Sequence, residues 1–238
     1  MNLTPKQIAK MIDHTILAPN IRSEDIVRLC KEADSYQFAS VCVNPSFVAL
    51  AAECLKNSET KVCTVIGFPL GAVTTEDKIK ETENAVLNSC DEVDMVIDIS
   101  SALEGNFKKV KEDISGVVTA ASRSGKHLGK KIIVKVILET CYLDDETIRQ
   151  CCICAKEAGA DFVKTSTGFG TPKDSNGTLL PNGATVHHIK LMRDTVGSDM
   201  GVKASGGIRS AEQAKAMIEA GATRIGTSSG IKIMETWN

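Results

Sequence analysis

Two hydrophobic periodicities alternate along the whole chain, and this alternation restricts the fold more than any other feature of the sequence. Eight short runs rich in β-branched residues predict strands, and longer amphipathic stretches between them predict helices. Strands that are apolar on both faces and separated by helices form parallel sheets covered by helices. The predicted strands are Asp13–Leu17, Ala39–Val43, Val62–Gly67, Val93–Ile97, Ile132–Leu138, Phe162–Thr165, Val202–Ser205 and Arg224–Thr227. The predicted helices are Ser23–Ser35, Pro45–Lys56, Glu76–Ser89, Asn106–Ser122, Asp144–Ala158, Ala184–Val196 and Ser210–Ala220.

Residues typical of helix boundaries agree with this division. Ser23 and Asp144 stand where N-caps are expected, and Gly221 follows the last periodic residue of its helix. Eight such units in a chain of 238 residues predict an α/β fold of the (β/α)8 TIM-barrel type. No linker rich in Pro, Gly or Ser interrupts the pattern, so we expect one domain over residues 1–238. An extra N-terminal helix, Pro5–Met11, should close the lower end of the barrel.

Charge and hydropathy argue against several classes of partner. The net charge is −2 and no cluster of Lys or Arg dominates, which argues against nucleic acid or an anionic membrane as the partner. The densest basic stretch, Lys126–Lys131, is interpreted as a solvated loop before a strand. No apolar run approaches the ~20 residues of a spanning helix, and the N-terminus lacks a signal-peptide pattern. We therefore expect a cytoplasmic protein.

The cysteine pattern indicates reduced thiols. The chain has nine cysteines, an odd number, and several fall inside predicted strands or helices. The segment Cys151–Cys154 has C-x-x-C spacing, but it lies in a predicted helix and no second ligand pair accompanies it. We expect neither a metal site nor a redox site there.

Ionisable or reactive side chains interrupt six of the apolar strands. Active sites of such barrels lie at the C-terminal ends of the strands, and strand side chains alternate between inward and outward directions. Each residue alone has an ordinary explanation, since a lysine late in a strand can extend to solvent and an aspartate can cap a helix. Neighbouring ammonium groups, however, lower each other's pKa, and a neutral amine can form a Schiff base with a carbonyl carbon. The candidates are Asp13, Cys42, Asp94, Lys135, Lys164 and Lys203.

Glycine-rich turns follow the late strands, where barrels of this kind commonly bind phosphate. Gly206-Gly207 precedes a predicted helix, Gly226–Gly230 lies after the last strand, and Gly168 lies at the end of the sixth. Either turn alone is equally well explained as a tight turn. Together they favour a sugar phosphate as the ligand.

The segment Thr171–Gly183 is the one long irregular stretch between predicted elements. Loops of this length inside a compact domain are usually functional or mobile. Its Asn176-Gly177 and Asn182-Gly183 pairs favour tight turns with positive φ. Because Leu179-Leu180 is apolar, we expect a partly mobile flap whose leucines fold back onto the barrel rim.

The residues around these candidates resemble those of one enzyme family. The resemblance spans essentially the whole chain, the matching phrases occur in the family's order, and the Lys-Thr-Ser-Thr-Gly phrase is highly specific. On these phrases the chain resembles deoxyribose-phosphate aldolase of the class I, metal-free type. The phrases are Asp13-His-Thr, Val41-Cys-Val-Asn-Pro45, Asp91-Glu-Val-Asp-Met-Val96, Val134-Lys-Val-Ile, Phe162-Val-Lys-Thr-Ser-Thr-Gly168, Gly201-Val-Lys-Ala-Ser-Gly-Gly-Ile-Arg209 and Arg224-Ile-Gly-Thr-Ser-Ser229.

The resemblance implies a role for each candidate. Lys164 would form the imine with the donor aldehyde, Lys203 would be the cation that lowers the pKa of that amine, and Asp94 would move protons, partly through water. The supporting polar residues would be Asp13, Cys42 and Lys135, and the phosphate would be held by Gly168, Gly206, Gly207, Ser228 and Ser229.

The resemblance also implies a reaction and its substrates. The reaction would be reversible cleavage of 2-deoxy-D-ribose 5-phosphate to acetaldehyde and D-glyceraldehyde 3-phosphate. No metal or other cofactor is implied, because a protonated imine is itself an electron sink. The partners would be sugar phosphates and aldehydes, and a homodimer is compatible with the fold because such barrels often pair.

Two alternatives remain open at the level of the sequence. One is another Schiff-base aldolase or a transaldolase, which would differ in substrate rather than in the lysine. The other is a catalytically silent barrel that binds sugar phosphates, for which the glycine turns would suffice. A binding protein has no need of Asp94, Lys164 and Lys203 together, so we favour an enzyme.

Overall fold

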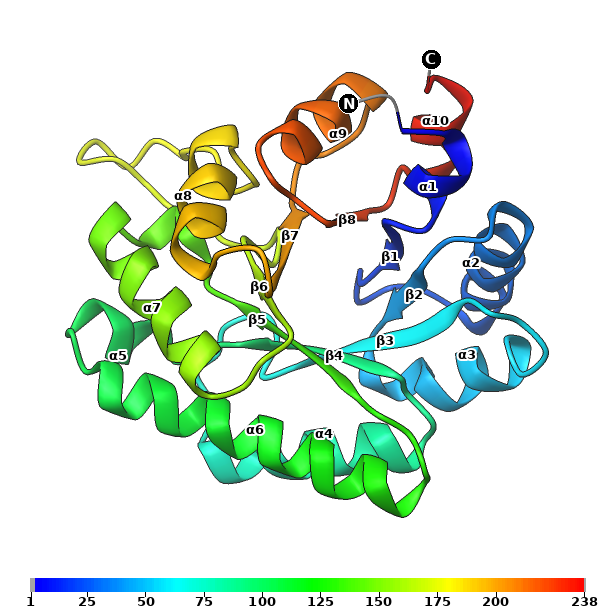
Figure 1. Ribbon diagram of the computed structural model, residues 1–238, viewed down its shortest axis with the longest axis horizontal. Helices are drawn as coiled ribbons and strands as arrows, with labels where there is room; N and C mark the ends of the chain where they lie inside the picture. The colour runs from blue at the N-terminus through cyan, green and yellow to red at the C-terminus, as the bar shows by residue number, and fades with distance from the viewer. Residues whose placement is uncertain (1–2, 238) are drawn as a thin grey trace.

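Eight parallel strands pair in the order of the sequence, and β8 pairs with β1 to close the barrel (Figure 1). The computed structural model describes residues 3–237. The predicted single-domain TIM barrel is therefore confirmed, and each strand boundary lies within one residue of the predicted one. The strands are β1 (Ile12–Ile16), β2 (Ser40–Val43), β3 (Lys61–Ile66), β4 (Glu92–Val96), β5 (Ile133–Ile137), β6 (Phe162–Lys164), β7 (Gly201–Ser205) and β8 (Arg224–Thr227).

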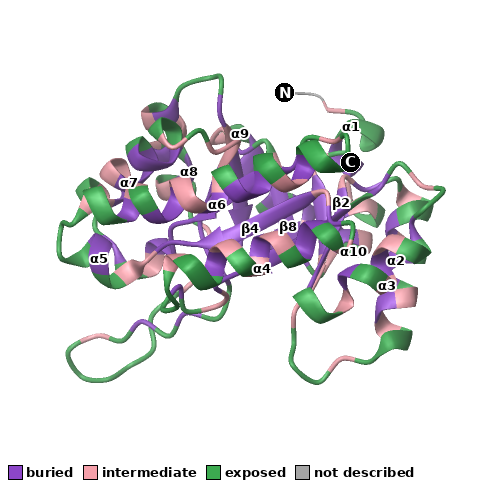
Figure 2. Cartoon of the chain, turned by 90° about the horizontal axis from the view of Figure 1, so that it is seen from below, coloured by how far each residue is buried: buried purple, intermediate pink, exposed green. Residues whose placement is uncertain are grey.

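Helices surround the strands and bury one face each against them. Figure 2 shows buried residues on the strands and on the inward faces of the helices, and exposed residues on the outside. Within residues 3–237, none of the helices combines the length and the apolar character that a membrane crossing requires. The helices are α1 (Pro5–Ala9), α2 (Ser23–Tyr36), α3 (Val48–Cys54), α4 (Thr75–Leu87), α5 (Ile99–Leu103), α6 (Phe107–His127), α7 (Asp145–Glu157), α8 (Val186–Val196), α9 (Ala211–Glu219) and α10 (Gly230–Glu235).

Two predicted helices have different limits in the structure. The predicted helix Pro45–Lys56 begins as a 3-10 turn, η1 (Pro45–Phe47), and α3 starts only after it. The long helix α6 continues through His127, so Lys126 is helical and not part of the predicted solvated loop. Basic residues in the last turn of a helix interact favourably with its dipole, which explains this extension.

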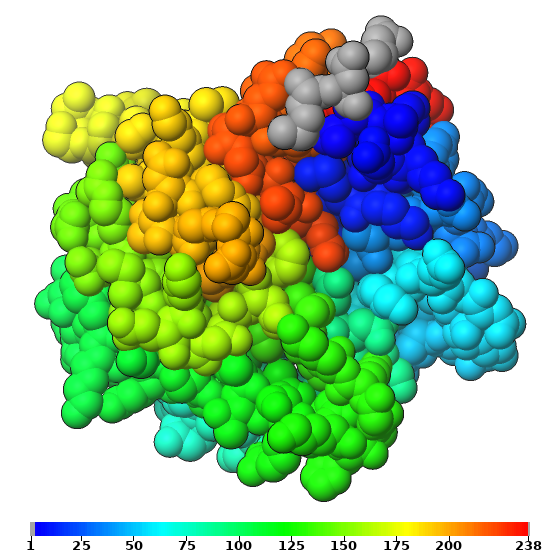
Figure 3. Space-filling model, in the orientation of Figure 1, coloured from blue at the N-terminus to red at the C-terminus, as the bar shows by residue number. Residues whose placement is uncertain are grey.

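Of two short helices, the sequence pattern predicted one and missed the other. The expected N-terminal helix is α1; it buries Ile8 and Ala9, and it lies beside α10 at the edge of the barrel rather than over its centre (Figure 1). Figure 3 shows these first and last segments in contact. The helix α5 was not predicted, because its five residues span fewer than two turns and no period repeats in them; α1 is equally short, but the predicted helix Pro5–Met11 was two residues longer. It is capped by Asp98, whose carboxylate accepts a hydrogen bond from the backbone N–H of Ser101 at 3.0 Å.

The long segment after β6 forms a projecting hairpin. Its strands meet at an antiparallel bridge between Lys173 and Leu179, and Gly177 takes a φ of +81° at the turn, as its Asn-Gly pair predicts. The prediction that the leucines fold back onto the barrel rim is wrong, because Leu179 is 64% and Leu180 47% exposed. The hairpin instead extends away from the barrel (Figures 2 and 3).

Candidate functional site

Asp94 lies in the middle of β4 and binds three lysines inside the barrel. Its Oδ1 is 2.9 Å from the Nζ of Lys135, and its Oδ2 is 2.7 Å from the Nζ of Lys164 and 2.6 Å from that of Lys203. All four side chains are buried. The register explains the grouping, since Asp94 is paired with Lys135 across β4 and β5, and Lys164 with Lys203 across β6 and β7.

A second layer of charge lies toward the N-terminal ends of the strands. Asp13, at the second position of β1, receives the ammonium of Lys203 at 2.5 Å, the guanidinium of Arg224 at 2.6 Å and the hydroxyl of Ser40 at 2.7 Å. Glu92 lies 2.5 Å from the Nζ of Lys135 and 3.1 Å from Arg224. Asp13 is therefore deeper in the barrel than a residue at the C-terminal rim, where the sequence analysis had placed it.

Glu92 and Arg224 had not been singled out as site residues. Glu92 shares the face of Asp94 by the two-residue period of a strand, so its inward direction was readable from the sequence. Arg224 is the first residue of β8, and its guanidinium also lies 5.3 Å from the ring centroid of Phe162. A charged residue at the first position of a strand is expected at the surface, so the sequence did not indicate that Arg224 belongs to the network.

The charges of this network do not balance. Its cations are Lys135, Lys164, Lys203 and Arg224, and its carboxylates are Asp13, Glu92 and Asp94, so four positive groups face three negative ones. Burying an unbalanced charge is costly unless the group loses its proton. One of the amines is therefore the natural site for a neutral form.

The pKa shifts indicate which groups keep their charge. Burial alone would raise the pKa of Asp94, but Lys135, Lys164 and Lys203 hold it well below its usual range. Burial disfavours the ammonium of Lys203, but the carboxylates of Asp13 and Asp94 outweigh burial and raise its pKa. Lys135 behaves in the same way, with Asp94 as its main counterion, and its pKa is raised well above the ordinary value. Lys135 and Lys203 thus stay protonated near neutral pH.

Lys164 differs from the other two lysines in its contacts and position. It is the last residue of β6 and lines a cavity of about 310 Å³, whereas Lys135 and Lys203 do not line it. Its ammonium contacts one carboxylate, that of Asp94, while those of Lys135 and Lys203 each contact more than one. Lys164 is the amine of this network that a small molecule in the cavity can reach.

The glycine turns form the other end of the same cavity. Gly206 and Gly207 line it with φ values of +91° and +79°, and Ser228 lines it from the turn after β8. Gly168 and Ser229 do not line the cavity. A Cβ at Gly168 would lie 4.0 Å from the Cα of Gly206, and the backbone N–H of Ser229 donates to the hydroxyl of Thr227 at 2.9 Å.

Two polar residues of the cavity had not been assigned to the site. Arg209 lines it and carries an exposed guanidinium, and Ser205 lines it with a buried hydroxyl that lacks a hydrogen-bond partner within the described chain. Both stand inside the Gly201–Arg209 phrase, which was the available signal. A cation and a free hydroxyl next to two glycine turns suit a phosphate group.

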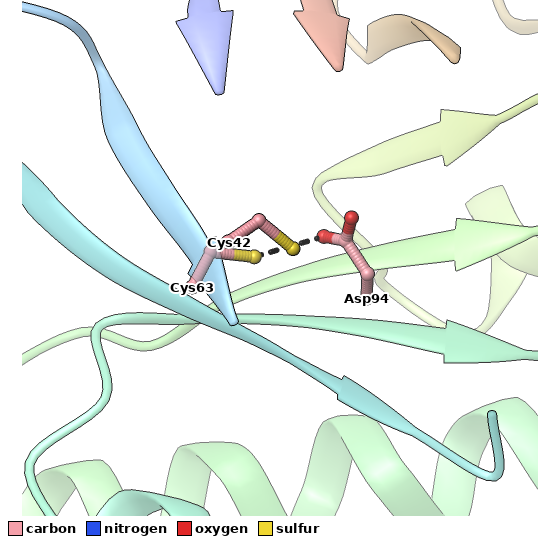
Figure 4. A group of neighbouring side chains, drawn as sticks. All are labelled: Cys42, Cys63 and Asp94. Atoms are coloured by element: carbon pink, nitrogen blue, oxygen red, sulfur yellow. Dashed lines mark hydrogen bonds between the residues drawn. The ribbon is translucent and has the colours of Figure 1, made fainter. Parts of the chain in front are cut away.

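Cys42 lies in the barrel interior beside a second thiol (Figure 4). Cys42 and Cys63 are paired in register across β2 and β3, and the Sγ of Cys63 is 3.3 Å from the Oδ1 of Asp94. The hydrogen bond from Cys63 lowers the pKa of Cys42, and burial raises the pKa of Cys63. The ammonium of Lys135 contacts both Cys63 and Asp94, at 3.4 and 2.9 Å. A cation therefore already lies between the thiol of Cys63 and the carboxylate of Asp94.

The sequence is similar to a family of known enzymes. Residues 7–236 match the model of the DeoC/LacD family of aldolases. A deoxyribose-phosphate aldolase of Caldanaerobacter subterraneus subsp. tengcongensis is 57% identical over 230 residues, which cover 97% of this chain and 93% of that one. A deoxyribose-phosphate aldolase of Clostridium perfringens is 56% identical over 230 residues, which cover 97% of this chain and 95% of the relative.

Solved structures agree with this relationship. A tetrameric deoxyribose phosphate aldolase from Aeropyrum pernix superposes with a TM-score of 0.85 at 34% identity, covering 98% of this chain and 91% of that chain. A structure from Coccidioides immitis superposes with a TM-score of 0.87 at 38% identity, covering 98% of this chain and 86% of that one. With a matching family model over nearly its whole length and relatives above half identity, the chain belongs to the DeoC/LacD family of aldolases.

Proposed function

We propose that this aldolase reversibly cleaves 2-deoxy-D-ribose 5-phosphate to acetaldehyde and D-glyceraldehyde 3-phosphate through a Schiff base on Lys164. The observation that carries the proposal is that Lys164, alone of the three network lysines, borders the cavity that also contains the Gly206-Gly207 turn. A carbonyl carbon at one end and a phosphate at the other fit this arrangement. The relatives named as deoxyribose-phosphate aldolases support the choice of substrate.

The chemistry begins with attack of the neutral Lys164 amine on C1 of the open-chain sugar, followed by loss of water to give a protonated imine. The C3 hydroxyl then gives up its proton, the C2–C3 bond breaks, and its electron pair forms the enamine of acetaldehyde. D-Glyceraldehyde 3-phosphate leaves, C2 takes up a proton, and water hydrolyses the imine to free acetaldehyde. The protonated imine accepts the electron pair, so the residues of the chain supply what the reaction requires.

We assign the movement of these protons to Asp94. It contacts the reacting amine directly, and its low pKa keeps it a carboxylate in the resting protein. A carboxylate can accept a proton or orient a water molecule that carries one. Lys135 and Lys203, which stay charged, and Asp13 hold Asp94 and Lys164 in this arrangement.

The phosphate is assigned to the glycine end of the cavity. Gly206, Gly207 and Ser228 line that end, Arg209 adds a positive charge, and Gly168 and Ser229 each adjoin in sequence a residue that lines the cavity. Backbone N–H groups and an arginine bind phosphate through charge-assisted hydrogen bonds. This end would hold the sugar so that its C1 points to Lys164.

Reductive trapping tests the proposal. Incubation with acetaldehyde and borohydride should attach a two-carbon group to the Lys164 peptide, detected by mass spectrometry, and the Lys164→Met variant should lose both this label and turnover of deoxyribose 5-phosphate. Lys131, whose side chain is exposed, serves as the control lysine and should stay unlabelled. A label on Lys203 or Lys135 would refute the assignment, and a wild-type protein without turnover would refute the substrate.

A further inference from the structure

Glu139 has an unusual backbone conformation for a residue other than glycine. It follows β5 by two residues and adopts φ 55° and ψ 59°, in the left-handed region. Its side chain is only 1% exposed, although it carries a carboxylate. Residues are kept in such conformations when surrounding contacts compensate for the strain, and such residues concentrate near functional sites.

Most side-chain hydrogen bonds of Glu139 are with the segment that follows Lys164, and the thiol of Cys141 donates a further one at 3.8 Å. Both carboxylate oxygens accept hydrogen bonds from the backbone N–H of Thr167, each at 3.2 Å, and the hydroxyl of Thr167 binds the same carboxylate. That hydroxyl in turn accepts the backbone N–H of Phe169 at 2.9 Å. One buried carboxylate therefore organises the turn from Thr167 to Phe169.

Backbone hydrogen bonds hold the two segments together at the same place. The N–H of Leu138 donates to the carbonyl oxygen of Lys164 at 2.9 Å, and the N–H of Thr140 donates to that of Thr165 at 3.0 Å. The strand β6 has only three residues and ends at Lys164, so its ladder does not extend to Thr167. Beyond the end of the ladder, the side chain of Glu139 holds the two segments together.

The turn that Glu139 holds forms one wall of the cavity. Thr167 and Phe169 line the cavity together with Lys164, and a Cβ at Gly168, between them, would lie 4.0 Å from the Cα of Gly206. Movement of this turn would therefore change the distance between the amine end and the glycine end. Burial raises the pKa of Glu139, while hydrogen bonds from Thr167 and the charge of Lys164 oppose the rise, which shows that these contacts favour the ionised form.

We infer that Glu139 is a positioning residue that fixes the Thr167–Phe169 wall and thereby sets the fit of phosphorylated substrates between Lys164 and the Gly206-Gly207 turn. This inference rests on the proposed function, because it takes the glycine end as the phosphate end. Glu139 does not line the cavity, so its effect passes through Thr167. Loss of its carboxylate should weaken binding of the long, phosphorylated substrate and spare imine formation with acetaldehyde, which needs only the amine end.

The substitution Glu139→Gly tests this effect without adding backbone strain, because glycine adopts positive φ readily. Loss of hydrogen bonds to a charged group should raise KM for deoxyribose 5-phosphate by about 10- to 100-fold. The rise in KM for unphosphorylated 2-deoxyribose should be much smaller, and borohydride trapping of acetaldehyde on Lys164 should be unchanged. The variant Glu139→Gln, which retains an acceptor for the N–H of Thr167, should fall between Glu139→Gly and the wild type.

A second pair of variants approaches the same contact from the other side. Thr167→Val removes the hydroxyl and keeps a similar shape, so it should reproduce part of the rise in KM. Thr167→Ser keeps the hydroxyl and should give a KM close to that of the wild type. If Glu139→Gly unfolds below the assay temperature, the two Thr167 variants test the inference in its place. An unchanged KM, an equal loss with both sugars, or loss of acetaldehyde trapping in a folded variant would overturn the inference. A wild-type protein that does not turn over deoxyribose 5-phosphate would overturn the proposed function instead.

Discussion

Lys164 and Lys203 share one oxygen of Asp94, and this sharing is the residue-level basis of the proposed chemistry. The substitution Lys203→Leu would leave that oxygen to Lys164 and so favour its protonated, unreactive form. The pH dependence of kcat/KM should then move to more alkaline values, with a loss of about 10²–10⁴-fold at neutral pH, as for other acid–base groups. Lys203→Arg, which keeps the charge, is the control. An unchanged pH–rate profile for Lys203→Leu would contradict this explanation.

Asp94→Asn should affect both turnover and folding. Loss of a group that moves protons typically costs about 10²–10⁴-fold in turnover. The same change leaves the three buried lysines around a neutral amide, and removing one partner of a buried ion pair costs about 3–5 kcal/mol. Single-turnover kinetics and thermal unfolding measure the two effects separately. If the folded variant no longer traps acetaldehyde, Asp94 acts before the imine forms.

The residues at the centre of the network were predictable, and those at its lower edge were not. Lysines and aspartates inside apolar strands stand out in the sequence, so Asp94, Lys164 and Lys203 could be identified without coordinates. Glu92 and Arg224 begin their strands, where charge is expected at a surface. Their burial depends on the tilt and closure of the barrel, which strand periodicity does not specify.

At the level of elements, prediction succeeded wherever a period could repeat. The long helices of the barrel span two or more turns, whereas α5 has five residues, fewer than two turns of about 3.6 residues. The hairpin after β6 shows a different limit of prediction from sequence. Its Asn176-Gly177 turn was predictable from local chemistry, but the exposure of Leu179-Leu180 depends on whether a surface lies within reach.

The base of this hairpin, rather than its tip, contacts the glycine end of the cavity. A Cβ at Gly183 would lie 2.3 Å from the carbonyl oxygen and 2.7 Å from the carbonyl carbon of Gly206, so Gly183→Ala must displace backbone. We expect KM for the phosphorylated substrate to rise by about tenfold or more, since small misplacements near a binding group have large effects.

Replacement of Thr178–Pro181 by a Gly/Ser link is the matched control for this prediction. This segment is the returning arm of the hairpin, and because Leu179 and Leu180 are exposed, its replacement should leave KM and the melting temperature nearly unchanged. This expectation replaces the one drawn from the sequence, which placed the leucines on the rim. A larger KM effect from this replacement than from Gly183→Ala would show that the hairpin closes over the substrate.

For the molecule as a whole, the buried carboxylates predict sensitivity to acid. The folded-state pKa values of Asp13 and Asp94 lie below the ordinary value of 3.8, so their ionised forms stabilise the fold above that pH. This stabilisation is lost as the pH falls from 3.8 through the folded-state values, by ~1.4 kcal/mol per pH unit for each group. Urea unfolding should therefore give a free energy that declines steeply below about pH 4.

The matching variant isolates the contribution of one carboxylate. Asp13→Asn should be less stable than the wild type at pH 6 and should show a shallower decline in acid, because one of the shifted groups is gone. A wild-type free energy of unfolding that is equal at pH 3 and pH 6 would contradict the ionisation assigned to both residues.

The distribution of the network among the strands has a consequence for how the barrel is assembled. Its carboxylates, Asp13, Glu92 and Asp94, come from β1 and β4, whereas its cations, Lys135, Lys164, Lys203 and Arg224, come from β5 to β8. Within this network, each half of the chain therefore contributes charges of one sign, and these like charges repel one another. The charges of each half are neutralised by those of the other, so neither half-barrel can exclude water from its charged side chains by itself. The reactive amine acquires its surroundings only when the two halves pack together.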